Sequence, residues 1–127
     1  MASPDKISLI IQSGAYDRVH YALVMASAAL AVGKPVTLFF TMGGTRALTK
    51  DWADQARESA FTEIGLATFE DLLNACQELN ATFMVCELGL RSEKLDTGDL
   101  RADIPITEGS AVSFLSDASE KGAILYV

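Results

Sequence analysis

Short apolar runs alternate along the chain with segments in which apolar residues recur at helical spacing. The runs are rich in β-branched and aromatic residues and predict strands at residues 7–11, 36–40, 82–86, 104–106 and 123–127. Helical spacing predicts helices at residues 16–32, 68–80, 88–95 and 108–122. This alternation favours right-handed crossovers and an α/β fold. We expect a three-layer sandwich with a five-stranded, mostly parallel sheet, of the flavodoxin-like kind, in one domain over residues 1–127.

Turn and cap residues mark several of the predicted boundaries. Gly33 is a plausible end for the first helix, and Asn80 can take the left-handed conformation that ends the second. Thr68 and Asp71 have the spacing of a capping box. Residues 45–67 follow no single pattern, because Gly65 interrupts a face with helical spacing, and we consider a mobile flap for part of them.

Composition narrows the classes of function. The chain has 127 residues, 50% of them hydrophobic, and a net charge of −7. It lacks the clustered Lys and Arg that nucleic-acid binding needs, so a basic partner or a neutral small molecule fits better. No stretch approaches the roughly 20 apolar residues of a membrane span, and the first residues lack a signal-peptide pattern. We therefore expect a cytoplasmic protein whose two cysteines stay reduced.

The common cofactor and metal signatures are missing. The turn at Ser13-Gly14 cannot form the dinucleotide fingerprint, and there is no phosphate-binding loop with a Lys-[Ser/Thr] ending. One histidine and two separated cysteines cannot supply a closed zinc site, so we expect no metal. His20 lies inside the first helix, and a Cys-His nucleophile pair requires the second cysteine to face that helix. A histidine at the helix surface or an interface is the preferred interpretation.

The two cysteines have different predicted roles. Cys76 lies on the apolar stripe of the helix at 68–80 and is interpreted as core. Cys86 ends the strand at 82–86, on the edge of a parallel sheet where ligand sites concentrate. It is either the last apolar residue of that strand or a thiolate stabilised by the start of the next helix. Glu87 opposes ionisation, whereas the cations of the following segment, Arg91, Lys94 and Arg101, offset it if they lie near.

Four segments resemble one known family. These are the strand ending in Ser13-Gly14, residues 33–41, the Gly43-Gly44 turn and, above all, residues 85–90, Val-Cys-Glu-Leu-Gly-Leu. They are similar to the DsrE/DsrF-like proteins of sulfur relay, which include the TusD-type persulfide carriers. The resemblance covers nearly the whole chain and implies a DsrE-like domain that forms homo-oligomers, as trimers or hexamers. It also implies that Cys86 accepts a sulfane sulfur as a persulfide and passes it to a TusA-like carrier, with no cofactor.

Neighbouring residues are expected to complete the sulfur site. Backbone N–H groups at the start of the helix after Cys86 can stabilise an anionic sulfur, and loops 14–17 and 42–45 end on the same sheet edge. Ordinary turn chemistry is the alternative for these loops. The expected substrate-binding residues are Gly14, Gly43, Gly44, Glu87, Leu88 and Gly89.

Two other functions stay open. In one, the chain is a non-catalytic oligomeric binding or assembly subunit in which Cys86 only packs. In the other, the thiols have a redox role, which requires Cys76 within about 7 Å of Cys86, Cα to Cα, to form a disulfide. The redox role is the weaker alternative, because the sequence has no Cys-x-x-Cys.

Overall fold

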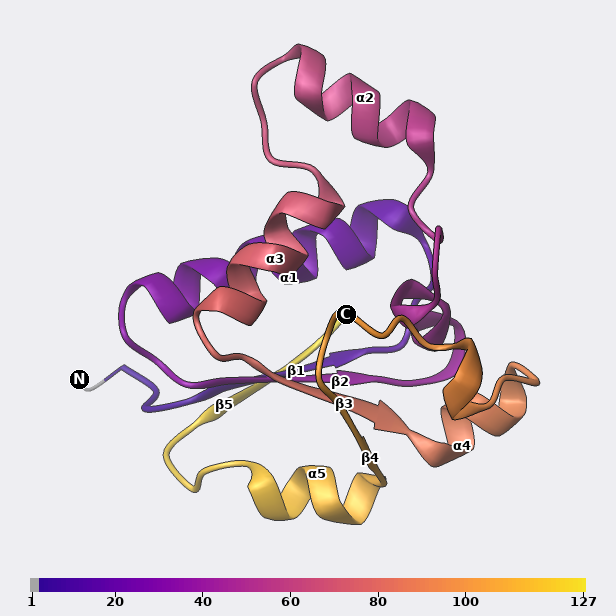
Figure 1. The fold of residues 1–127 in the computed structure, drawn as a ribbon. Helices are drawn as coiled ribbons and strands as arrows, with labels where there is room; N and C mark the ends of the chain where they lie inside the picture. The colour runs from indigo at the N-terminus through magenta and orange to yellow at the C-terminus, as the bar shows by residue number, and fades with distance from the viewer. Residues whose placement is uncertain (1–2) are drawn as a thin grey trace.

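A parallel sheet of five strands runs through the centre of the computed structural model, which describes residues 3–127 (Figure 1). The strands are β1 (Ile7–Ile11), β2 (Val36–Phe40), β3 (Thr82–Cys86), β4 (Ile106–Gly109) and β5 (Ala123–Tyr126). Their order across the sheet is β4-β3-β2-β1-β5, and each neighbouring pair is parallel. The predicted α/β class and parallel sheet are confirmed.

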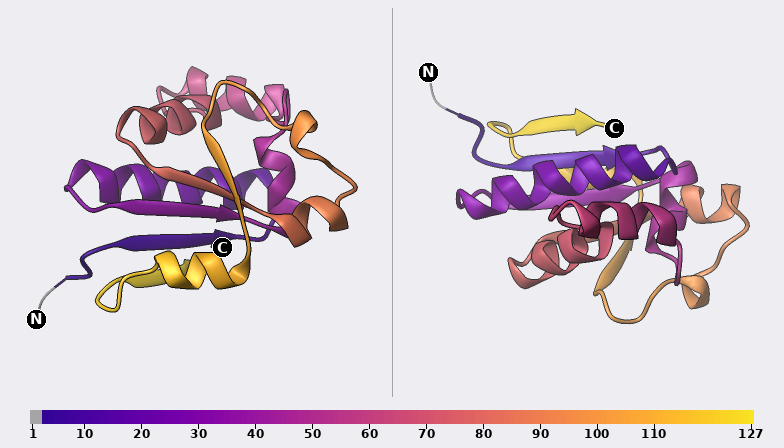
Figure 2. Two further views of the ribbon diagram at one scale, coloured as in Figure 1. Left: turned by 60° about the horizontal axis from the view of Figure 1, so that its bottom comes forward. Right: turned by 90° about the horizontal axis from the view of Figure 1, so that it is seen from above.

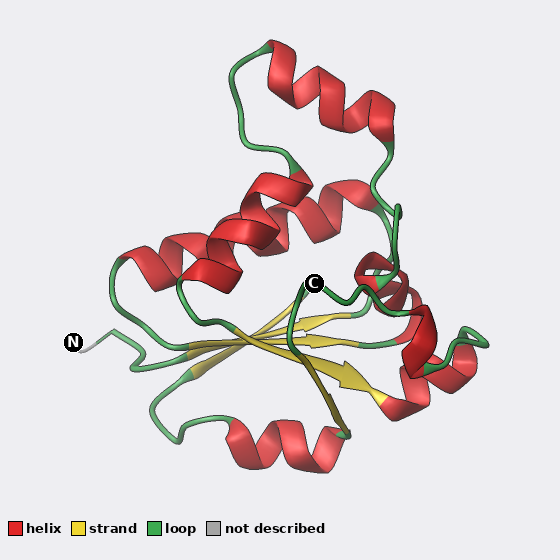
Figure 3. Ribbon diagram, viewed as in Figure 1, coloured by secondary structure: helices red, strands yellow, loops and turns green. Residues whose placement is uncertain are grey.

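Helices cover both faces of this sheet, as Figure 3 shows by colour. The helical segments are α1 (Tyr16–Ala31), the 3-10 helix η1 (Met42–Leu48), α2 (Gln55–Glu63), α3 (Phe69–Glu78), α4 (Glu87–Ser92), the 3-10 turn η2 (Thr97–Asp99) and α5 (Ala111–Asp117). α1 and α3 lie on one face and α5 lies on the other (Figures 1 and 2). α2 stands away from the sheet, beyond α1 and α3. No helix within residues 3–127 is long and apolar enough to cross a membrane.

Side chains that alternate along β3 divide the core into two clusters. Phe83 and Val85 belong to the larger cluster, which α1 and α3 cover. Met84 and Cys86 point to the opposite face, where they form a small cluster with Phe39 and Phe114. The rings of Phe39 and Phe114 stack with their centroids 4.7 Å apart. The last residue of β3 is therefore directed toward α5, because side chains on a strand alternate with a period of two.

Several predicted boundaries are confirmed. Gly33 has a φ of 85° just after α1, and Asn80 has a φ of 66° just after α3. Thr68 caps α3 through a reciprocal pair of hydrogen bonds with Asp71. These positions were predictable because the backbone geometry at a helix end depends mainly on local residues.

The segment around Pro105 differs from the prediction. A strand was expected at residues 104–106, but β4 begins at Ile106 and continues to Gly109. Ile104 lies outside the ladder and is buried in the larger core cluster. Pro105 has no N–H to donate, which is consistent with its place just before the strand.

The two helices nearest the expected site also have different limits from those predicted. α5 begins at Ala111 rather than after Thr107, because the Ser110 hydroxyl accepts a hydrogen bond from the Ser113 N–H and caps the helix there. It ends at Asp117, before the expected end at Gly122. α4 begins at residue 87, directly after β3, and ends at residue 92 instead of 95.

Residues 45–67, which followed no single pattern, form most of η1 and all of α2. Asp54 caps α2 by accepting a hydrogen bond from the Arg57 N–H. Glu58 is the buried residue of α2, so a polar group rather than an apolar stripe fastens this helix to the body. This explains why hydrophobic periodicity did not reveal it.

Candidate functional site

Cys86 is the last residue of β3 and the N-cap residue of α4. It pairs in register with Gly109 of β4, so it lies at the carboxyl end of the parallel strands. Its side chain is 5% exposed and packs in the cluster that contains Met84 and Phe114. The thiol is thus held at the sheet edge expected for a ligand site, within a mainly apolar environment.

A cavity of about 420 Å³ opens beside this cysteine. Residues from the end of β3 and from α4 form one wall, and the start of α5 forms the other. The lining residues are Cys86, Glu87, Leu88, Arg91, Ser110, Ala111 and Val112. The cavity falls within the size range typical of small-ligand sites, so the buried thiol borders a space that a small molecule can occupy.

The rim of this cavity combines apolar side chains with one charge of each sign. Leu88 and Val112 are 61% and 76% exposed, so both present apolar surface to solvent on either side of the cavity. Glu87 and Arg91 supply a carboxylate and a guanidinium. Exposed apolar side chains that lie close together are a feature of protein-docking surfaces.

Cys86 stands at the start of α4, the helix whose first N–H groups are expected to stabilise an anionic sulfur. α4 has six residues, and the Cys86 side chain makes no capping hydrogen bond to its first turn. The backbone of Cys86 is extended, with a ψ of 126°, and its side chain packs against Phe114 of α5. Gly89 serves close packing: a Cβ there would lie 2.6 Å from Thr45 Oγ1 of η1.

Gly14, Gly43 and Gly44 do not line the cavity but pack tightly near the same end of the sheet. A Cβ on Gly14 would lie 2.7 Å from the carbonyl oxygen of Gly43, and one on Gly44 would overlap the carbonyl oxygen of Ile11. The Gly44 N–H also donates to the carbonyl of Gln12 at 2.9 Å. These glycines therefore let η1 rest against the end of β1, which supports the wall behind α4.

The second cysteine and the histidine lie on the opposite face of the sheet from this cavity. Cys76, on α3, is fully buried in the larger core cluster, and burial raises the pKa of its thiol to about 11. His20, on α1, is on the same side of the sheet as Cys76. Because Cys86 faces α5, the sheet separates it from both residues. The interpretation of Cys76 as core is consistent with this burial, and both cysteines are free thiols.

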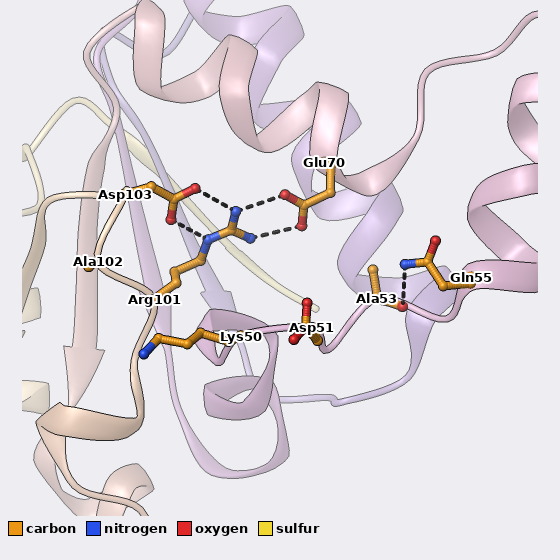
Figure 4. A pocket seen from close by; sticks show the side chains of 8 residues that line it. All are labelled: Lys50, Asp51, Ala53, Gln55, Glu70, Arg101, Ala102 and Asp103. Atoms are coloured by element: carbon orange, nitrogen blue, oxygen red, sulfur yellow. Dashed lines mark hydrogen bonds and ion pairs between the residues drawn. The ribbon is translucent and has the colours of Figure 1, made fainter.

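A second pocket, of about 500 Å³, lies where α3 meets the segment before β4 (Figure 4). Arg101 dominates it, with hydrogen bonds of 2.7 to 2.8 Å to both oxygens of Glu70 and both oxygens of Asp103. Hydrogen bonds to Asp103 and then to Glu70 raise the pKa of the guanidinium, and the same contact lowers the pKa of Asp103. These hydrogen bonds attach the segment before β4 to α3, and they pair the Arg101 side chain with two carboxylates.

Sequence reasoning missed two features of these sites. It did not find the wall formed by Ser110 and Val112, although the Ser-x-x-Ser spacing of 110 and 113 was a detectable capping signal. It also left the position of Arg101 open, as one of three cations considered for the surroundings of Cys86. Its partner Glu70 is 31 positions away, so no local pattern indicated that pair.

No group of three or more His, Cys, Asp or Glu side chains in the described part of the chain is placed to hold a metal ion. The two pockets described above therefore differ in chemistry. The polar pocket is built around Arg101, whose charge is paired with two carboxylates. The cavity beside β3 is lined by the thiol of Cys86.

Comparisons with known proteins place these features in context. A family model described as the DsrE/DsrF-like family matches residues 5–125. No curated protein matches the chain. Two solved structures are similar: a protein of unknown function, MTH1491, from Methanobacterium thermoautotrophicum, and the ychN protein from E. coli. MTH1491 has a TM-score of 0.70 at 13% identity, with 96% of this chain and 98% of that chain covered. The ychN protein has a TM-score of 0.64 at 13% identity, with 97% and 99% covered.

Proposed function

Because the chain belongs to the DsrE/DsrF-like family, whose name is associated with sulfur relay, we propose that it carries sulfur as a persulfide on Cys86. The single observation that supports this assignment is the position of the thiol. Cys86 ends β3 and borders a cavity of about 420 Å³, whereas Cys76 is enclosed in the core. A transferable sulfur must be reachable by two reactants in turn, and of the two cysteines Cys86 is the one beside a cavity that offers that access.

The proposed chemistry consists of two balanced exchange steps. The Cys86 thiolate attacks the outer sulfur of a donor persulfide, R–S–SH. A bond forms between Sγ and that sulfur, the donor S–S bond breaks, and the donor leaves as the thiolate R–S⁻. An acceptor thiolate then attacks the outer sulfur of Cys86–S–SH, which restores the Cys86 thiolate. No external oxidant, reductant or cofactor is needed.

The environment of the cavity supports a protein as the acceptor. Leu88 and Val112 present apolar surface at its mouth, and Arg91 offers a positive charge that favours an approaching thiolate or persulfide anion. We propose a TusA-like sulfur carrier as the acceptor and a homo-oligomer, a trimer or hexamer, as the assembly. A cytoplasmic location is part of the same proposal, since a reducing compartment keeps both cysteines free.

A second candidate function has its own supporting observation. Cys86 is only 5% exposed and packs with aromatic and thioether side chains, as a structural cysteine would. In this alternative the chain is a non-catalytic assembly subunit, and the cavity beside β3 receives part of a partner rather than a sulfur donor.

Intact-mass measurement after treatment with a small persulfide donor separates the two candidates. Relay predicts a gain of about 32 Da for each transferred sulfur atom. The gain should disappear in Cys86→Ser and remain in Cys76→Ser. Adding a TusA-like carrier should then remove the extra mass from this chain and add it to the carrier.

Other outcomes count against the assignment. An adduct that persists in Cys86→Ser but is lost in Cys76→Ser would show that Cys76, and not Cys86, carries the sulfur. No adduct on the folded wild-type chain would favour the assembly subunit. Light scattering that shows a monomer at micromolar concentration would contradict the homo-oligomer independently of the sulfur chemistry.

A further inference from the structure

A third cavity lies on the opposite side of the sheet from Cys86 and has a different character. Its volume is about 540 Å³, and it lies between α1, α2 and the connection to α3. Its lining residues are Asp17, His20, Tyr21, Val24, Phe61, Leu66, Ala67 and Leu72. Six of these are apolar or small, so the wall is mostly hydrocarbon and aromatic carbon, as in sites for small uncharged ligands.

His20 is the polar group built into this wall. The residue is 8% exposed, and its Nε2 lies 2.9 Å from the carbonyl oxygen of Ala67. A carbonyl only accepts, so Nε2 must carry a proton, and in the neutral form of the ring Nδ1 is then an acceptor. Nδ1 has no hydrogen-bond partner within residues 3–127. Within the same residues, the one side-chain nitrogen or oxygen that is both shielded from solvent and without a hydrogen bond is Thr45 Oγ1, so Nδ1 is not shielded from solvent. Nδ1 therefore keeps some exposed surface, and the residue that carries it lines this cavity.

Stacked rings hold this imidazole in place. Phe61 of α2 stacks on it with centroids 4.2 Å apart and an interplanar angle of 12°. Tyr16 stacks near both rings, with centroid distances of 5.8 Å to His20 and 6.1 Å to Phe61. Trp52 extends the series at 6.0 Å from Tyr16. The histidine is thus oriented by aromatic neighbours on one side and by a backbone carbonyl on the other, so its free nitrogen is fixed before any ligand arrives.

The charges around the cavity favour a neutral occupant. Asp17 is the ionisable carboxylate in the lining, and it forms an ion pair with Arg57 of α2. Arg57 also lies over the Tyr16 ring, 5.1 Å from its centroid. Neither charge is left without a partner to attract an ion. A planar ring with one N–H or O–H donor matches both the stacked rings and the single open acceptor.

We propose that this cavity is a second binding site, for a neutral planar heteroaromatic molecule that stacks beside Phe61 and donates one hydrogen bond to His20 Nδ1. The site is independent of the Cys86 cavity, because the sheet lies between them. α2 contributes one wall of it, which gives a role to a helix that otherwise stands away from the body (Figure 1).

Indole and benzofuran form a matched pair of probes for this site. They have nearly the same shape, but benzofuran has an oxygen where indole has the N–H donor. Titration of the full chain with each, followed in ¹H–¹⁵N NMR spectra, should shift signals of Val24, Leu66 and Leu72. Indole should bind about fivefold more tightly than benzofuran, the usual value of one net hydrogen bond.

Two substitutions test the location without removing the histidine. Ala67→Phe places a ring in the cavity and should abolish the indole shifts. Ala60→Phe makes the same change at an exposed position of α2 outside the lining and should leave them intact. Cys86→Ser should also leave them intact, so failure of the sulfur assignment does not affect this result.

Three results would overturn the proposal. The first is the absence of shifts at low millimolar indole in the folded chain. The second is equal binding of indole and benzofuran, which would show that Nδ1 takes no part. The third is a loss of oligomer in Ala67→Phe but not in Ala60→Phe, because a second copy of the chain would then be the occupant.

Discussion

Glu58 provides the sharpest test of how this fold is held together. Its carboxylate is 8% exposed and accepts three hydrogen bonds. The N–H groups of Phe69 and Glu70 donate to it at 2.7 Å and 3.2 Å, and the Tyr16 hydroxyl donates to the same oxygen as Phe69. One side chain of α2 therefore joins the start of α3 to the start of α1. We predict that Glu58→Ala is strongly destabilising.

The magnitude follows from these contacts. A hydrogen bond to a charged group contributes about 1.5–3 kcal/mol, and contacts that share one carboxylate are not additive. The carboxylate also lies at the N-terminus of α3, where an anion is favoured. Burial and then the bond to Glu58 raise the pKa of Tyr16, so this hydroxyl stays a donor at neutral pH and loses its partner in the variant. We expect a loss of about 3 kcal/mol in the free energy of unfolding.

Urea unfolding measures this quantity, with circular dichroism for the helices and fluorescence of the single tryptophan for the local packing. Trp52 contacts Phe69 with centroids 5.0 Å apart, so its emission reports on the same region. Glu63→Ala is the matched control, because it removes an exposed glutamate from the same helix and should change stability by less than about 0.5 kcal/mol. If Glu58→Ala costs no more than this control, the three hydrogen bonds do not hold α2 in place.

Two further predictions concern other parts of the molecule. Gly44→Ala should cost about 3 kcal/mol in urea unfolding, because its Cβ would overlap the Ile11 carbonyl oxygen, whereas Gly33→Ala, in open space at positive φ, should cost only about 1 kcal/mol; equal losses would refute the close-packing argument. For Asp117, partial burial alone would raise the pKa, but hydrogen bonds from a lysine and a threonine outweigh it and lower the pKa. Its stabilising contribution should be full above about pH 4 and should disappear as the pH falls through the lower folded-state pKa, so urea midpoints of Asp117→Asn should fall less steeply with acid than those of wild type.

Local signals accounted for much of the fold. The strand at residues 82–86 was predictable because β-branched and aromatic residues fill a short apolar run between turn residues. The end of α3 at Asn80 was predictable for a similar reason, since a left-handed residue after a helix depends on its own side chain. By contrast, β4 was misplaced because Ile104 resembles a strand residue but is used in the core, a choice that tertiary packing makes.

The candidate site was harder to predict than the fold. The position of Cys86 at the carboxyl end of β3 followed from the place where the apolar run of residues 82–86 stops. Its side-chain direction depended on the phase of the alternation along β3, which decides whether the thiol meets α1 and α3 or α5. The opposite wall, with Val112, comes from a segment that joins the site only through the β3–β4 pairing, and nothing near residue 86 in the sequence indicates it.

The unequal division of the core affects how the chain can change during evolution. Most buried apolar residues lie between the sheet and the α1–α3 layer, while α5 alone covers the other side through a small cluster around Phe114. Substitutions in the α5 layer remove less buried surface and so threaten folding less than substitutions in the thicker layer. The surface around the thiol can therefore change at little cost to folding, while the opposite layer preserves the architecture.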